Sequence, residues 1–176
     1  MANREALREL QSRLASRLQA ARTEGVQAAW LAVEAAGRKY LFPLTQSGEI
    51  FPFSSIQPVP YTQGWFLGVA NLRGGLYGVV DLASYVSGQA PAQRSDAGRA
   101  ESRLVALNAL LEVNCALLID RLAGLRNMEA FTTSAEPPEG SPDYFGSGYT
   151  DAGGAYWQEI NLQALSQQPQ FLSISA

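Results

Sequence analysis

The sequence of 176 residues contains no histidine, a single cysteine and a single lysine. Histidine is the commonest general base near neutral pH and a common zinc ligand, so its absence excludes Ser-His-Asp and Cys-His nucleophiles. One cysteine excludes an internal disulfide and a Cys-x-x-Cys metal site. A Walker A loop needs serine or threonine after its lysine, but Lys39 is followed by Tyr40. Most catalytic templates therefore lack the residues that they need, which favours a protein with no enzyme activity, no cofactor and no metal, while a small enzyme built on carboxylates stays open.

Charge is also scarce, because charged residues make up 16% of the chain against roughly 25% in average soluble domains. The net charge is −3, and residues 41–72 contain no basic side chain beside their aromatic ones, which does not suit a nucleic-acid groove. The charge-free stretch 50–72 contains three prolines and two glycines, which does not suit a membrane span. The N-terminus lacks the apolar core of a signal peptide. We expect a cytoplasmic protein that neither binds nucleic acid nor inserts into a membrane.

Residues 1–24 differ from the rest of the chain. Leucines recur at spacings of three and four, with arginines on the remaining surface, which predicts an amphipathic helix over about residues 3–22; the leucines are Leu7, Leu10, Leu14 and Leu18. Gly25 is the predicted end of this helix. Two interpretations stay open: the helix packs on its own domain, or it binds a partner, including a second copy of the chain.

After residue 25 the pattern changes to short apolar runs bounded by glycine, proline and serine. Three pairs of runs predict hairpins with turns at 37–39, 73–75 and 112–114, and 144–150 and 155–160 are weaker strand candidates. Asp81 and Asn161 each follow such a run at equivalent places in two similar segments, where each can cap a short helical turn. Residues 87–102 carry no large apolar side chain and are interpreted as a mobile seam between two halves.

Four side chains are candidates for chemistry or binding. Cys115 lies in an apolar run, which favours a buried, inert thiol. Asp81 and Asp120 both end apolar runs, as a catalytic pair of carboxylates would, but cap and turn residues give the same pattern. Arg73 is the only basic residue between Lys39 and Arg94 and lies at a predicted hairpin tip, which favours presentation to a partner.

One longer pattern is more specific. In residues 60–82 a proline-containing loop leads to Asn71-Leu72-Arg73-Gly74 and then to a strand that ends in Asp81. This block resembles the signature of CheW-like domains, and the strand ending in Asp120 resembles the second landmark of that family. The extra N-terminal helix and the ending of the chain are similar to the PilI-type branch, the adaptors of twitching-motility chemosensory systems.

The resemblance implies a mostly β fold of two small interlocked five-stranded SH3-like β-barrels over residues 25–173, with an N-terminal helix and a short C-terminal helix. It implies a non-catalytic adaptor in the cytoplasm, recruited to membrane-associated receptor arrays. The implied partners are the regulatory domain of a CheA-type histidine kinase and the cytoplasmic tip of a methyl-accepting chemoreceptor, with type IV pilus twitching as output. The alternative is an assembly protein that keeps the fold without coupling to a kinase.

The site residues follow from the same resemblance. The motif at the hairpin matches the family's receptor and kinase contact, and residues 46–50 align with a strand that contributes to receptor binding. The resemblance thus implies seven protein-interaction residues, namely Ser47, Glu49, Gly68, Asn71, Leu72, Arg73 and Gly74. The family usually has an apolar or β-branched residue at the position of Ser47, so a different receptor partner is one interpretation.

Overall fold

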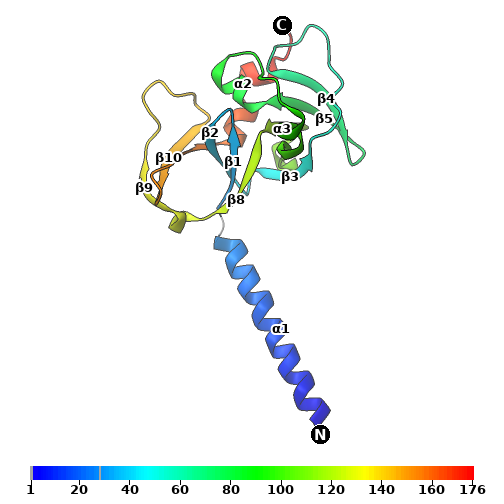
Figure 1. The fold of residues 1–176 in the computed structure, drawn as a ribbon, viewed down its shortest axis with the longest axis vertical. Helices are drawn as coiled ribbons and strands as arrows, with labels where there is room; N and C mark the ends of the chain where they lie inside the picture. The colour runs from blue at the N-terminus through cyan, green and yellow to red at the C-terminus, as the bar shows by residue number, and fades with distance from the viewer. Residues whose placement is uncertain (1, 28) are drawn as a thin grey trace.

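The computed structural model describes the backbone of residues 2–27 and 29–176 and consists of a long N-terminal helix followed by two β-sheets (Figure 1). Sheet A has six strands in the order β8-β1-β2-β11-β10-β9. Its strands are β1 (Trp30–Ala35), β2 (Arg38–Pro43), β8 (Arg121–Arg126), β9 (Phe131–Ala135), β10 (Phe145–Asp151) and β11 (Tyr156–Ile160). Sheet B has five strands in the order β3-β6-β7-β5-β4. Its strands are β3 (Ser47–Pro52), β4 (Phe66–Leu72), β5 (Gly75–Asp81), β6 (Arg103–Leu107) and β7 (Cys115–Ile119).

The helical elements are short, apart from the first. The α-helices are α1 (Ala2–Gln27), α2 (Leu82–Ser87), α3 (Asp96–Glu101), α4 (Leu162–Ser166) and α5 (Pro169–Leu172), and two 3₁₀ turns are η1 (Ala109–Leu111) and η2 (Met128–Ala130). Asp81 and Asn161 accept hydrogen bonds from the backbone N–H groups of Ser84 and Ala164, so both predicted caps are confirmed. No helix in the described part of the chain is long and apolar enough to cross a membrane.

The two sheets interlock along the chain. After α1, the chain forms β1 and β2 of sheet A, then all of sheet B, and returns to sheet A with β8. Parallel pairing of β2 with β11 and of β5 with β7 joins segments that are distant in sequence. The predicted seam at residues 87–102 therefore lies within sheet B, between β5 and β6, and the changes of sheet occur after β2 and after β7.

The sheets share a hydrophobic core, to which sheet A contributes Val33 and Phe42 and sheet B contributes Val105 and Leu117. Strand β1 is buried on both of its faces, because Ala32 packs in a second cluster with the two tryptophans of sheet A. A strand covered on both faces has a continuous apolar sequence instead of an alternating one. This burial explains why the run after residue 29 has almost no polar residue.

The predicted mostly β fold with terminal helices is confirmed, and the hairpins are found as β1–β2, β4–β5 and β6–β7. The two weaker candidates correspond to β10 and β11. Sheet A has six strands instead of the five expected for each barrel. The patterns missed β8 and β9, whose side chains are all exposed or only partly buried, so neither strand shows an apolar alternation.

Helix α1 extends away from the two sheets (Figure 1). Side-chain exposure is described for residues 4–17, where Leu7, Leu10 and Leu14 are 59%, 58% and 52% exposed. The leucine face of this part of the helix is therefore open to solvent and does not pack on the sheets.

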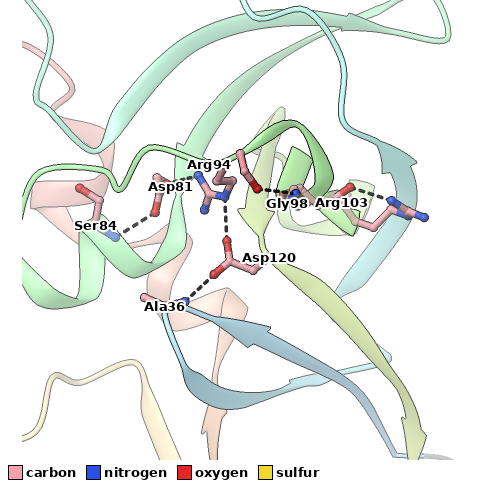
Figure 2. A network of polar contacts seen from close by, with 9 residues as sticks. Ala36, Asp81, Ser84, Arg94, Gly98, Arg103 and Asp120 are labelled. Atoms are coloured by element: carbon pink, nitrogen blue, oxygen red, sulfur yellow. Dashed lines mark hydrogen bonds and ion pairs between the residues drawn. The ribbon is translucent and has the colours of Figure 1, made fainter. Parts of the chain in front are cut away.

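Arg94 joins the two sheets through a network of charged groups (Figure 2). Its Nη1 donates to Oδ2 of Asp81 at 3.1 Å, and its Nε donates to Oδ1 of Asp120 at 2.7 Å. Oδ2 of Asp120 accepts a hydrogen bond from the Ala36 N–H in the β1–β2 turn, at 2.7 Å. The segment interpreted as mobile thus has an anchor. The lack of large apolar side chains in residues 87–102 did not reveal this anchor, because the anchoring side chain is an arginine.

We expect Arg94→Ala to destabilise the fold by about 3 kcal/mol, because it leaves the carboxylate of Asp81, which is 1% exposed, without its cation. The free energy of unfolding from urea denaturation checks this. Arg17→Ala, at an exposed position of α1, is the matched control and is expected to change stability by less than about 0.5 kcal/mol. Equal stability of the two variants would contradict a structural role for the network.

Candidate functional site

The tip of the β4–β5 hairpin is a two-residue turn formed by Arg73 and Gly74. Leu72 pairs with Gly75, and the two turn residues have φ angles of +49° and +81°. Positive φ at both central positions is the signature of a type I′ turn, whose twist matches that of the flanking strands. The Gly74 N–H donates to Oδ1 of Asn71 at 3.0 Å. The motif therefore builds a rigid turn with its arginine at the outermost position.

Arg73 forms an ion pair with Glu49 of β3. Strands β3 and β4 lie at opposite edges of sheet B, so this pair connects the two edges at one end of the curved sheet. The arginine side chain is 78% exposed and the glutamate side chain 44%. Ion pairs in such exposed positions contribute little to stability. Both charged groups are therefore accessible to a partner.

Two exposed apolar residues, which the motif did not indicate, lie close to this ion pair in the strands. Ile50 follows Glu49 in β3 and is 38% exposed; Leu76 pairs with Asn71 across the hairpin and is 63% exposed. Their exposure only becomes apparent from the register and curvature of the sheet. We call Glu49, Ile50, Asn71, Arg73 and Leu76 the hairpin-tip surface.

The other predicted site residues serve the packing around this surface. Leu72 is 5% exposed and belongs to the core of sheet B. Gly68 has a φ of +135°, and a Cβ there would lie 2.1 Å from the carbonyl oxygen of Gln57, so only glycine fits. Ser47 donates through Oγ to the carbonyl oxygen of Pro43 at 3.0 Å, which fastens the start of β3. Any part of these three in partner binding stays a prediction.

The second candidate is the pair Asp81 and Asp120, of which the first side chain is buried and the second is 40% exposed. Both carboxylates bind Arg94, and each also accepts a backbone hydrogen bond. A carboxylate held in this way orients the backbone, which is the cap and turn role that the sequence pattern also allowed. Among the described residues, no three histidine, cysteine or acidic side chains gather in a way that fits a metal ion.

The thiol of Cys115 lies inside β7 and is 4% exposed. Burial raises its pKa to about 12, because a thiolate there would lose its hydration. The predicted burial of this residue is thus confirmed, and its lack of reactivity stays a prediction.

The sequence and the fold of this chain are similar to those of known proteins. The profile of the CheW-like domain matches residues 29–170, so the chain belongs to the CheW-like family. It is 26% identical over 141 residues to Protein PilI of Pseudomonas aeruginosa, covering 79% of this chain and 75% of that protein. The scaffolding protein TtCheW of Thermoanaerobacter tengcongensis has the same fold, with a TM-score of 0.63 and 19% identity over 82% of this chain and 95% of that one. The resemblance of residues 60–82 to this family is thereby confirmed.

Arg73→Gly is expected to leave the free energy of unfolding unchanged or to raise it by up to about 1 kcal/mol. Glycine adopts a positive φ without strain, and the exposed ion pair that is lost contributes little. Gly74→Ala, one position later, is the comparison and is expected to lose about 1 kcal/mol. Thermal denaturation measures both, and a large loss in Arg73→Gly would show that the ion pair is structural.

Cys115 is expected to resist modification by a thiol reagent such as dithionitrobenzoate at pH 8 in the native protein, because its pKa of about 12 leaves almost no thiolate. In a denaturant that unfolds the chain, one thiol per chain should react at once. Rapid reaction without denaturant would show that β7 opens readily.

Proposed function

We propose that this protein is a non-catalytic adaptor that couples methyl-accepting chemoreceptors to a CheA-type histidine kinase, with type IV pilus twitching as the output. Membership of the CheW-like family supports an adaptor, and the similarity to PilI supports twitching motility as the process. The chain has no histidine, which agrees with phosphorylation on the kinase. The proposed location is the cytoplasm, at membrane-associated receptor arrays.

The observation that carries the proposal is the exposed Glu49–Arg73 pair on a rigid turn. Arginine is enriched among the residues that dominate binding energy, especially beside apolar side chains that exclude water. Ile50 and Leu76 provide such apolar neighbours. Because the turn is already ordered by Asn71, little entropy is lost when a partner binds it.

In this proposal the adaptor acts by geometry. It holds a kinase regulatory domain and a receptor tip on separate faces, so that a change in the receptor biases the conformation of the kinase. Each interface is expected to bury on the order of 800 Å² per partner. The polar groups of the hairpin-tip surface need only bind and orient, which suits a surface without a reactive side chain.

A second candidate is an assembly protein of the pilus or chemosensory complex that keeps the fold without coupling to a kinase. The exposed leucine face of α1 favours it, because a helix with such a face gains stability by packing against another helix. Self-association through α1 is part of this candidate. Sedimentation of the full chain and of a Leu10→Glu variant tests it.

We expect isothermal titration calorimetry to detect micromolar binding of this protein to the regulatory domain of a CheA-type kinase from the same organism. Arg73→Ala should weaken that binding by about 1–2 kcal/mol, because the guanidinium is the central charged anchor. Arg99→Ala is the matched control, since this arginine is also exposed but lies on α3, and its affinity should equal that of the native protein.

The outcomes separate the candidates. If Arg73→Ala and the native protein bind the kinase domain with equal affinity, the hairpin-tip surface would be assigned to receptor binding instead. A soluble receptor-tip fragment would test that assignment. Absence of binding to the kinase domain, with the protein shown to be folded, would falsify the kinase-coupling proposal and leave the assembly protein.

A further inference from the structure

A pocket of about 510 Å³ lies on sheet A, away from the hairpin-tip surface. Its walls come from the β1–β2 turn and β2, from the start of β11, from Phe145 of β10 and from Pro138 in the loop before it. Pockets of roughly 300–1,000 Å³ with aromatic walls and a few polar groups are typical ligand sites.

The walls of this pocket are aromatic and held in place. The hydroxyl of Tyr156 donates to Oε1 of Gln158 at 2.9 Å, and Nε2 of Gln158 donates to the carbonyl oxygen of Gly146 at 2.8 Å. The opposite wall begins at the β1–β2 turn, which Asp120 fastens through the Ala36 N–H. Little ordering is therefore needed when a ligand enters.

The pocket carries an unbalanced positive charge. None of its lining residues is acidic. Lys39 is paired with Glu34, and its ammonium group lies 4.9 Å from the centre of the Trp157 ring. Arg38 is exposed and forms no ion pair with any carboxylate in the described part of the chain. Although the protein has a net charge of −3, this guanidinium favours a ligand with an anionic group in the pocket.

The strands that border the pocket are incompletely paired. Strands β2 and β11 run parallel, but only Tyr40 with Gln158 and Leu41 with Glu159 are in register. Residues 38–39 of β2 and 156–157 of β11 come just before these pairs. They pair with β1 and β10 on their outer sides, but not with each other. Main-chain groups at such a gap can bind the backbone of an extended peptide.

We propose that this pocket binds a short extended peptide segment of a partner protein in which an acidic residue is followed by an aromatic one. The carboxylate pairs with Arg38, and the aromatic ring packs between Tyr156 and Phe145. The main chain of the segment forms hydrogen bonds with the main-chain groups of β2 and β11 that are not paired with each other. The site is independent of the hairpin-tip surface, so it stands whether or not the kinase binds there.

The test is a titration of the ¹⁵N-labelled full chain with a blocked tetrapeptide, acetyl-Gly-Glu-Phe-Gly-amide, followed by two-dimensional NMR. We expect a dissociation constant on the order of 1 mM, with the largest shifts at the amides of Arg38, Ala155 and Tyr156. The peptides with glutamine in place of glutamate, and with alanine in place of phenylalanine, should each bind about tenfold more weakly.

Arg38→Gln should weaken binding of the tetrapeptide about tenfold, since it removes the charge and keeps a polar side chain. Arg8→Gln, at an exposed position of α1, is the matched control and should bind as the native protein does. Shifts confined to other surfaces, equal binding of the glutamine peptide, or unchanged binding by Arg38→Gln would overturn the proposal. Equal binding of free 3-phenylpropionate would overturn the peptide as occupant and assign the pocket to a small aromatic acid.

Discussion

The contact on which the rest of the structure depends is the bridge from Arg94 to Asp81 and Asp120. The bridge joins the ends of two neighbouring strands of sheet B, and through Ala36 it reaches the first turn of sheet A. A carboxylate as buried as that of Asp81 needs a cation beside it, because desolvation of an unpaired charge costs several kcal/mol. The two sheets are thereby held at one corner by a polar contact, while the apolar core holds them elsewhere.

The two surfaces proposed for binding follow from where the sheets remain open. At the hairpin tip, the exposed pair of Glu49 and Arg73 connects the opposite edges of sheet B. In sheet A, the short pairing of β2 with β11 leaves the gap beside Arg38. Each place combines an accessible guanidinium with apolar neighbours on a preordered backbone. Charged residues make up only 16% of the chain, so an accessible arginine beside apolar residues is a distinctive feature.

Much of the fold was predictable wherever the signal was local. Glycine and positive φ mark the turns at Gly37 and Gly74, and a polar residue after an apolar run marks the caps at Asp81 and Asn161. The missed strands β8 and β9 bury almost no side chain, so no periodicity exists to be found. The candidate site was located by its motif, but the motif did not separate the exposed Arg73 from Gly68, whose role in the structure is steric.

The sequence by itself determined the hairpins, the caps, the exclusion of histidine and disulfide chemistry, and the family motif, because each depends on residues close together in the chain or on composition alone. Only the tertiary structure decided that Arg94 anchors the segment 87–102, that Glu49 meets Arg73, and that sheet A opens beside Arg38. These contacts join residues separated by 13 or more positions or depend on the parallel pairing of distant strands. Local patterns do not encode such distances, which are set by the way the two sheets curve and pack together.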